Sequence, residues 1–239
     1  MKIFLDIETI PDQSEGALER FMGGEVKCPF TTKGDIGKDL GMTEAEYKFI
    51  PAADFKAMWV EKKGKEAAKA QAEEKWLKTS FDGARGQIVC ISYAFNQGSI
   101  IRRSVANCSE KQMLTDFWQE VEEMTQSKPK QFVAHNANFD LPFLFHRSVI
   151  NEVRPSFRFD PWARQGEKHY CTMEAWSGFK GMISLDSLAE ILGVAGKSKG
   201  ITGADVWPEF QKGNIDKISE YCADDVRVLR DIYNKMNFL

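Results

Sequence analysis

The stretch Lys2-Ile3-Phe4-Leu5-Asp6-Ile7-Glu8-Thr9-Ile10-Pro11 decides the fold, because it is an apolar run that a proline stops. It predicts a buried β-strand. Side chains of a strand alternate between its two faces, so Asp6 and Glu8 share one face and the apolar residues around them share the other. Two like charges on one face of a core strand repel each other and lose hydration, and a divalent cation is the simplest compensation. The stretch therefore predicts a core strand that ends at a metal-dependent active site.

The composition of the 239-residue chain indicates a large hydrophobic core and no membrane-spanning segment. Hydrophobic residues make up 43% and aromatic residues 12% of the chain. No run approaches the roughly 18 apolar residues of a membrane helix, and the acid at position 6 interrupts any signal-peptide pattern. The five cysteines are scattered and none belongs to a Cys-x-x-Cys pair, which disfavours a zinc cage or a disulfide framework. We therefore expect a cytoplasmic protein with no membrane partner.

The charge balance limits the kind of nucleic-acid contact. The chain has 32 basic and 35 acidic residues, for a net charge of −3. Proteins that coat nucleic acid non-specifically are strongly basic, so this class is excluded. A small contact with one phosphate terminus through metal ions is compatible with the charge.

The pattern along the chain predicts one domain, residues 1–239, with a largely helical insertion at residues 12–85. The Lys/Glu/Ala-rich part of the insertion, residues 61–78, is a good helix former with many (i, i+4) charge pairs. It fits either a solvated helical insertion or a lid over the substrate. Strands followed by alternating strands and helices indicate an α/β sheet with helices on its faces.

The expected elements after the insertion follow from residue periodicity and from capping residues. Strands are predicted at 87–95, 99–105 and 131–135, helices at 109–125, 141–150 and 184–192, an irregular segment at 151–183, and a long C-terminal helix capped by Asn214. Pro142 is expected in the first turn of its helix. Met113, Phe117, Val121 and Met124 are expected on the buried face of the helix at 109–125.

An acid stands inside the apolar stripe of the C-terminal helix. The stripe steps by three and four residues through Ile218, Cys222, Asp225, Leu229, Ile232 and Met236. Tyr221 lies one turn before Asp225, so the two side chains share a side. Taken alone, the position of Asp225 favours a tilt into solvent or a pair with an arginine over a metal ligand. Asp224 beside it is expected at the surface.

A fourth carboxylate follows the strand predicted at 131–135. Asp140 precedes Pro142, where an ordinary helix cap would explain it. It also follows a strand end, where open α/β sheets place their sites. Asp6, Glu8, Asp140 and Asp225 together offer the oxygen ligands that Mg²⁺ and Mn²⁺ prefer. Such a set can hold two ions about 4 Å apart, the arrangement that cleaves phosphodiesters.

These residues occur in three motifs that resemble those of a known superfamily. The motifs are Asp6-Ile7-Glu8, Asn136-Ala137-Asn138-Phe139-Asp140 and Tyr221-Cys222-Ala223-Asp224-Asp225. They resemble, in this order, the three exonuclease motifs of the DEDDy-type 3′–5′ exonucleases, which belong to the DnaQ-like superfamily. The amino-acid sequence around the motifs most resembles that of the exonucleases related to the proofreading domain of family B DNA polymerases. The resemblance covers residues 1–11 and 87–239 and says little about 12–85.

The resemblance implies a ribonuclease H-like α/β fold, with a mixed five-stranded sheet flanked by helices. It also implies hydrolysis of the terminal phosphodiester at a 3′ end by two Mg²⁺ or Mn²⁺ ions, with release of nucleoside 5′-monophosphates. Carried onto this chain, Asp6, Glu8 and Asp225 bind one ion, and Asp6 bridges to the second, on which Asp140 acts through water. Tyr221 orients the attacking water. No catalytic position is missing, which disfavours an inactive relative.

Further residues are assigned to the substrate. We expect substrate contacts from Thr9, Asn136, Phe139 and Lys197. Phe139 and Trp162 are candidates for base stacking, although core packing explains both as well. Other candidates for contact with the phosphate backbone are Lys199, Arg147, Arg154, Arg158, Arg164 and Lys168. His135, His146 and His169 are expected to be structural residues or to lie at the surface.

Three functions stay open at this level. The first is a 3′–5′ exonuclease on the 3′ end of single-stranded DNA, in proofreading with a polymerase partner, or in repair, recombination or phage replication. The second is an exoribonuclease that trims RNA 3′ ends, because DEDDy members also process RNA. The third is a non-catalytic nucleic-acid-binding or assembly module whose insertion contacts a partner.

Overall fold

The protein contains two compact units in the computed structural model. The structure describes residues 1–24, 26–126, 130–157, 160–161, 169–178, 181–198 and 200–239. The first unit joins Met1–Gln13 to Thr79–Leu239, and the second is Ser14–Lys78. No described helix has both the length and the apolar character that a membrane crossing requires.

A five-stranded mixed sheet forms the centre of the first unit. Its strands are β1 (Lys2–Ile10), β2 (Gln87–Phe95), β3 (Ile101–Ser104), β4 (Gln131–Ala134) and β5 (His169–Cys171), in the order β3-β2-β1-β4-β5. The β1–β2 and β2–β3 pairs are antiparallel, and the β1–β4 and β4–β5 pairs are parallel. The expected α/β, ribonuclease H-like fold is confirmed.

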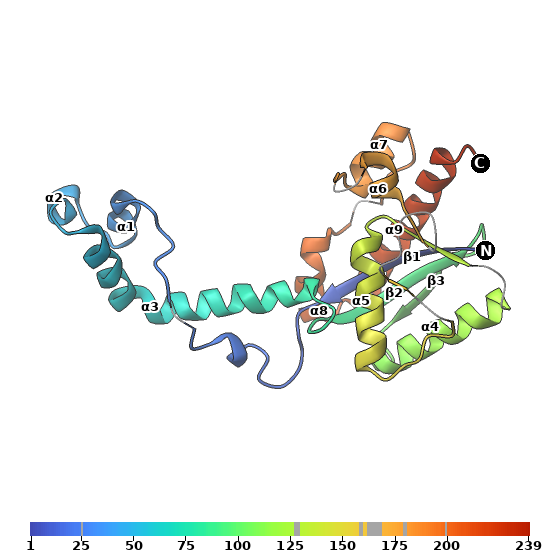
Figure 1. Cartoon of the computed structure of the whole chain (residues 1–239), viewed down its shortest axis with the longest axis horizontal. Helices are drawn as coiled ribbons and strands as arrows, with labels where there is room; N and C mark the ends of the chain where they lie inside the picture. The colour runs from blue at the N-terminus through green and yellow to red at the C-terminus, as the bar shows by residue number, and fades with distance from the viewer. Residues whose placement is uncertain (25, 127–129, 158–159, 162–168, 179–180, 199) are drawn as a thin grey trace. The chain divides into compact units, whose positions relative to one another are not determined.

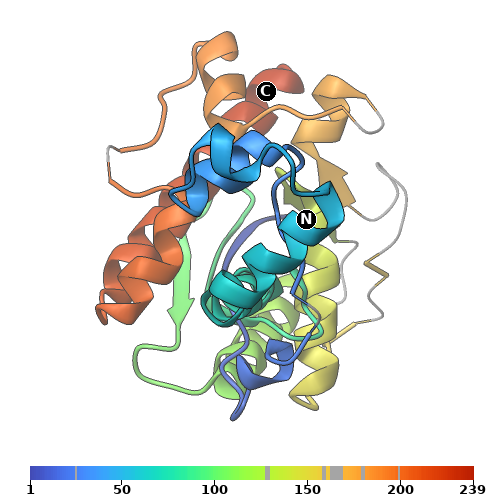
Figure 2. The ribbon, with the colours of Figure 1, turned by 90° about the vertical axis from the view of Figure 1, so that its left-hand side faces the viewer.

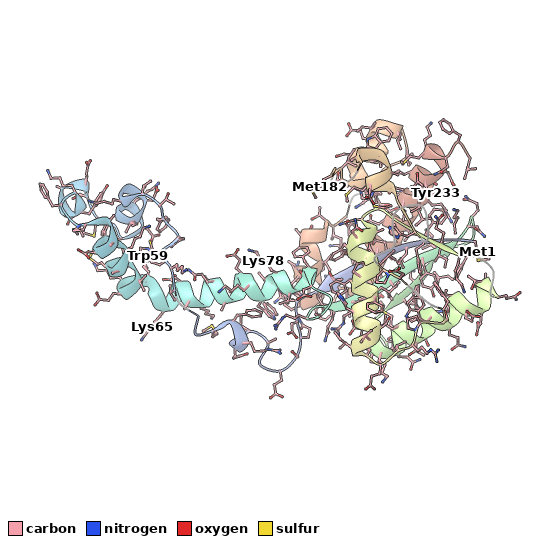
Figure 3. The ribbon with its side chains drawn as sticks, in the orientation of Figure 1. Met1, Trp59, Lys65, Lys78, Met182 and Tyr233 are labelled. Carbon is pink, nitrogen blue, oxygen red and sulfur yellow. The ribbon has the colours of Figure 1, made fainter. Side chains whose placement is uncertain are left out.

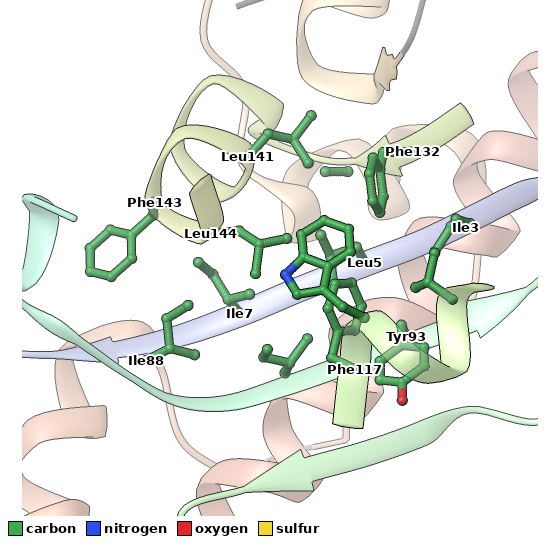
Figure 4. Close-up of a cluster of buried hydrophobic side chains, with 14 of the residues drawn as sticks. Ile3, Leu5, Ile7, Ile88, Tyr93, Phe117, Phe132, Leu141, Phe143 and Leu144 are labelled. Atoms are coloured by element: carbon green, nitrogen blue, oxygen red, sulfur yellow. The ribbon is translucent and has the colours of Figure 1, made fainter. Parts of the chain in front are cut away.

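The central strand β1 has the two faces that its sequence predicts. Ile3, Leu5 and Ile7 are buried in the largest apolar cluster, together with side chains of β2, β4 and two helices (Figure 4). Phe4 packs on the opposite face against a second cluster. Asp6 and Glu8 lie on this second face and are only partly covered. The strand therefore presents its carboxylates on the face opposite to the larger core.

Helices cover both faces of the sheet (Figures 1 and 2). On the face of Ile3 and Leu5 lie α4 (Glu110–Thr125) and α5 (Ala137–Ile150). On the other face lie α7 (Leu185–Leu192) and α9 (Ile215–Met236). Among the described residues this unit also has two short helices, α6 (Thr172–Ser177) and α8 (Val206–Gln211), and the 3₁₀ turns η2 (Lys78–Phe81) and η3 (Gly203–Asp205).

Helix α5 begins earlier than the sequence indicates. It starts at Ala137, with Asn136 at the N-cap position, and Pro142 lies inside it. The expectation that Pro142 marks the first turn is therefore wrong. A proline this close to a helix start removes one hydrogen bond, because it has no N–H, and the helix tolerates that loss near its end. Asp140 consequently lies in the first turn and not before the helix.

Two short elements and one side chain differ from the sequence-based expectation. Residues 169–171 form β5 and residues 172–177 form α6, inside the segment expected to be irregular. A three-residue strand is too short to show any alternation. Met124 is half exposed, although Met113, Phe117 and Val121 are fully buried. The buried stripe continues from Val121 to Thr125, four residues on, so Met124 lies off the buried face.

A buried ion pair joins α4 to α5 beneath the sheet. Arg147 donates two hydrogen bonds to Glu110, at 2.9 and 2.6 Å, and both side chains are at most 10% exposed. Glu110 also accepts the backbone N–H of Ile88 at 2.8 Å. The arginine is therefore committed to the core, and the expectation that it contacts a phosphate backbone is wrong.

Replacing Ser109 with alanine is expected to lower the stability by about 1 kcal/mol. The Ser109 hydroxyl caps α4 by accepting the Gln112 N–H at 3.2 Å, and losing such a cap costs about that much. The melting temperature should fall by about 2–4 °C. Lys111→Ala is the control, because Lys111 is exposed in the same turn. Equal melting temperatures for Ser109→Ala and Lys111→Ala would contradict the capping role.

The second unit is a small helical unit with its own core. It contains η1 (Glu19–Phe21), α1 (Lys33–Asp39), α2 (Glu44–Tyr47) and the long helix α3 (Ala52–Leu77). Ile36, Phe55 and Trp59 are buried together, and the Trp59 indole donates to Asp39 at 2.8 Å. Figure 3 labels Trp59 on α3. The later turns of α3 carry the Lys/Glu/Ala-rich sequence and bury only Gly64 and Ala72.

Candidate metal centre

Three carboxylates meet between the central strand and the last helix. Asp6 and Glu8 project from β1, and Asp225 projects from α9 toward the same face of the sheet. One carboxylate oxygen from each residue lies within 4.8 Å of the other two. The strand alternation and the helical stripe read from the sequence therefore converge at one point.

Local structure fixes this meeting point. The Cys222 thiol donates to the Asp6 carbonyl oxygen at 3.3 Å, so α9 rests directly on β1 one turn before Asp225. The β1–β2 register shifts between Glu8 and Thr9, where Glu8 faces Cys90 and Thr9 faces Ile88. Such a bulge bends a strand and turns its side chains, and it often lies beside an active site. The two carboxylates of β1 thus lie at the end of its regular pairing.

Burial and mutual repulsion disfavour the charged forms of the strand carboxylates. The pKa of Asp6 is raised well above its usual value, first by burial and then by the charges of Asp225 and Asp140. Burial likewise raises the pKa of Glu8, and the neighbouring Asp6 adds to the shift. Burial and repulsion therefore make the ionised carboxylates unfavourable when no cation is near them. A bound cation would stabilise the ionised forms and so counteract both effects.

Asp140 approaches the cluster from the first turn of α5. Asp140 is 4% exposed, and its carboxylate accepts the backbone N–H of Ile7. Burial raises the pKa of Asp140 to about 7, although that hydrogen bond opposes the shift. Asp140 is not among the three residues whose oxygens lie within 4.8 Å of one another. It lies close enough to raise the pKa values of Asp6 and Glu8 by repulsion.

Lys197 and Tyr221 lie against Asp225. The Lys197 ammonium is 2.9 Å from the Asp225 carboxylate and donates to the Tyr221 hydroxyl at 3.2 Å. It also lies over the Tyr221 ring, 4.7 Å from the centroid. Burial raises the pKa of Asp225 to about 6, while Lys197 partly offsets the shift. Burial and the Asp225 charge raise the pKa of the Tyr221 hydroxyl, so it stays protonated.

Two acids near Lys197 behave differently from the sequence-based expectation. Asp186, in the first turn of α7, lies 3.6 Å from the Lys197 ammonium and was not assigned to the site. In the sequence it stands two residues after the helix cap Ser184. Asp224 was expected at the surface, but it is partly buried. It accepts from the Ser198 N–H, and it pairs with Arg227 at 2.8 Å. It therefore anchors the loop that carries Lys197.

The remaining candidates border the cluster or lie elsewhere. The Thr9 hydroxyl donates to the Ser80 carbonyl at 2.7 Å. Asn136 is exposed at the N-cap of α5 and makes no side-chain capping bond. Phe139 is partly buried and its ring lies 5.5 Å from that of Phe143. Arg154 is exposed. Outside the described residues lie the candidates Trp162, Lys199, Arg158, Arg164 and Lys168.

The donor set fits a hard divalent cation. All the ligand atoms are carboxylate oxygens, which Mg²⁺ and Mn²⁺ prefer over nitrogen and sulfur. The Oδ2 atom of Asp6 is buried and has no hydrogen-bond partner among the described residues. A buried carboxylate oxygen without a donor is costly, and a metal ligand bond is a direct remedy. The ammonium of Lys197, which pairs with Asp225, carries one positive charge against the three carboxylates of Asp6, Glu8 and Asp225.

Comparison with known proteins agrees with this geometry. Residues 83–237 match the model of a family described as predicted 3′–5′ exonucleases related to the exonuclease domain of PolB. The matched region contains Asp140, Tyr221 and Asp225, and it excludes β1 and the unit Ser14–Lys78. No curated protein matches the sequence. Because the match spans more than half of the chain, the protein belongs to the family of predicted 3′–5′ exonucleases related to the PolB exonuclease domain.

Proposed function

We propose that the protein is a metal-dependent 3′–5′ exonuclease that shortens single-stranded DNA from its 3′ end and releases nucleoside 5′-monophosphates. The observation that carries the proposal is the approach of Asp6, Glu8 and Asp225, whose oxygens lie within 4.8 Å of one another. The family match gives the reaction class. The DNA substrate and the number of ions are the further steps of the proposal.

Each residue has a role that follows from its position. Asp6, Glu8 and Asp225 would hold two Mg²⁺ or Mn²⁺ ions, with Asp140 acting through water from the first turn of α5. Bound there, the ions supply Lewis-acid chemistry, which lowers the pKa of a water molecule and neutralises charge on the phosphodiester. Tyr221, protonated and beside Asp225, is placed to donate a hydrogen bond that orients the attacking water.

The positive charge of Lys197 is placed for contact with a substrate phosphate. Burial alone would lower the pKa of its ammonium, but the interactions with Asp225 and Tyr221 together outweigh burial and raise that pKa. The ammonium is therefore charged at neutral pH. We propose that it binds the phosphate next to the scissile bond, with Thr9, Asn136 and Phe139 lining the path of the strand.

An RNA substrate is the second candidate, because a metal site of this kind acts on the phosphodiester, which DNA and RNA have in common. Discrimination depends on how the site treats a 2′-hydroxyl. A non-catalytic module is disfavoured because the catalytic set Asp6, Glu8, Asp140, Tyr221 and Asp225 is complete. A polymerase or another replication or repair protein remains the proposed partner.

A 5′-labelled DNA oligonucleotide incubated with the protein and Mg²⁺ or Mn²⁺ is expected to give a ladder that shortens from the 3′ end. EDTA should stop the reaction, because the carboxylates cannot activate water without a metal. Parallel RNA and duplex substrates measure the preference for single-stranded DNA. Absence of shortening on every substrate, or shortening that persists in EDTA, would overturn the proposal.

A further inference from the structure

A buried serine stands in the apolar strand β2. Ser92 is fully buried, and its neighbours Ile91 and Tyr93 belong to the largest apolar cluster. The Ser92 hydroxyl has no hydrogen-bond partner among the described residues. A buried hydroxyl that has lost its water and gained no partner destabilises a fold. Packing of the strand therefore does not explain a serine at this position.

The pairing of β1 with β2 places Ser92 directly opposite Asp6. The register of this antiparallel pair joins Asp6 to Ser92 and Phe4 to Ala94. Opposite residues of an antiparallel pair project to the same face, with Cβ atoms about 4.5–5.5 Å apart. Phe4 and Ala94 confirm which face this is, because both belong to the apolar cluster that α9 covers. The hydroxyl of Ser92 thus lies on the carboxylate face, beside Asp6.

The groups of Ser92 and Asp6 are chemically complementary. The Oδ2 atom of Asp6 is buried and, like the Ser92 hydroxyl, lacks a hydrogen-bond partner among the described residues. A carboxylate oxygen accepts hydrogen bonds and a hydroxyl can donate one. Across the other edge of β2, Ser92 faces Arg102 of β3, whose guanidinium lies 3.9 Å from Glu220. A guanidinium only donates, so of these two neighbours across the sheet Asp6 is the acceptor.

We propose that Ser92 is a positioning residue of the metal centre, whose hydroxyl donates a hydrogen bond to the Asp6 carboxylate and fixes the direction in which that carboxylate meets the cation. Rotation about the Cα–Cβ bond of Ser92 turns the hydroxyl toward Asp6. The two oxygens of a carboxylate have about four lone-pair sites, so Asp6 can accept this hydrogen and bind a cation together. The inference rests on the proposed function and adds to it a residue outside the three motifs.

The test compares metal binding with metal-free stability. Mn²⁺ is titrated into the full-length protein without substrate, free Mn²⁺ is measured by electron paramagnetic resonance, and thermal melts are recorded in EDTA. Ser92→Ala is expected to raise the dissociation constant for Mn²⁺ about 10- to 100-fold, because hydrogen bonds behind a ligand support metal affinity to this extent. In EDTA its melting temperature should equal or exceed that of the wild type, because the variant removes a hydroxyl without a partner among the described residues.

A second buried serine supplies the matched control. Ser148 is also fully buried, but its hydroxyl donates to the Leu144 carbonyl at 2.8 Å and accepts the Trp118 indole N–H at 3.0 Å. Ser148→Ala should therefore lower the melting temperature in EDTA and leave the dissociation constant for Mn²⁺ unchanged. Ser92→Thr keeps a hydroxyl at the site and should bind Mn²⁺ as the wild type does.

Three results would overturn the role of Ser92. The first is an unchanged dissociation constant for Mn²⁺ in Ser92→Ala. The second is weaker Mn²⁺ binding together with a lower melting temperature in EDTA, because a loss of structure would then explain both. The third is a Ser92→Thr protein that melts as the wild type does but binds Mn²⁺ as weakly as Ser92→Ala, which would show that the hydroxyl is not the determinant.

Failure of this role and failure of the proposed function give different results. If the wild type shortens DNA and Ser92→Ala binds Mn²⁺ equally well, the role of Ser92 is wrong and the exonuclease stands. If the wild type shortens no strand, the ladder experiment overturns the proposed function, whatever the Mn²⁺ affinity of Ser92→Ala.

Discussion

Replacing Asp6 with asparagine is expected to lower the rate of nucleotide release about 10²–10³-fold and to stabilise the metal-free protein. The loss of rate follows because one charged ligand disappears from the centre of the cluster, and losing one preorganised electrostatic contact to a transition state costs about this much. The gain in stability follows because burial, Asp225 and Asp140 all disfavour the charged Asp6 carboxylate. Asparagine keeps the shape and removes the charge.

The two effects are measured on the same preparations. Initial rates on the labelled oligonucleotide in Mg²⁺ give the loss of activity, and thermal melts in EDTA at pH 8 give the change in stability. Asp216→Asn is the matched control, because Asp216 is exposed in the first turn of α9, away from the cluster. A variant at Asp6 that is both less active and less stable would indicate a structural role, and unchanged activity would exclude Asp6 from the site.

The metal-free protein is expected to lose stability from the site carboxyls as the pH rises from about 4 to about 7. The folded-state pKa of Asp140 is about 7 and that of Asp225 about 6, above the ordinary value of 3.8. Over this window the folded state holds protons that the unfolded chain has released, so the free energy of unfolding falls with pH. Each such carboxyl contributes about 1.4 kcal/mol per pH unit between its unfolded and folded pKa values.

Other groups also titrate in this range, so the measurement is a difference between two proteins. Urea unfolding in EDTA at pH 5, 6, 7 and 8 is compared for the wild type and Asp140→Asn, which keeps an acceptor for the Ile7 N–H. The wild type should be stabilised relative to the variant at pH 5 and should lose that advantage by pH 8. Mn²⁺ should stabilise the wild type more at pH 8 than at pH 5, because protons compete for the same oxygens. If the free energy of unfolding depended on pH in the same way for the wild type and Asp140→Asn, the raised pKa of Asp140 would be contradicted.

The sequence was sufficient where one side chain's direction follows from a regular element. The alternation of β1 placed Asp6 and Glu8 on one face, and the apolar stripe of α9 contained Asp225, which the structure buries. Both rules are local, because they depend only on the repeat of a strand or a helix. The family resemblance supplied the mixed five-stranded sheet, and with it a fifth strand that periodicity did not reveal in a segment of three residues.

The sequence was insufficient where a partner is distant in the chain or where a loop carries the residue. Arg147 was misassigned because its partner Glu110 lies 37 residues away and only the fold brings them together. Lys197 lies in a loop without periodicity, so its contact with Asp225 could not be anticipated.

The most direct test of the metal centre is the anomalous scattering from a crystal soaked with Mn²⁺ and a nucleoside 5′-monophosphate. The account predicts anomalous peaks between Asp6, Glu8 and Asp225, with the phosphate bound against them and Lys197 in contact with it. Absence of any peak at these three carboxylates at saturating Mn²⁺, in crystals of a protein that shortens DNA, would contradict the central claim.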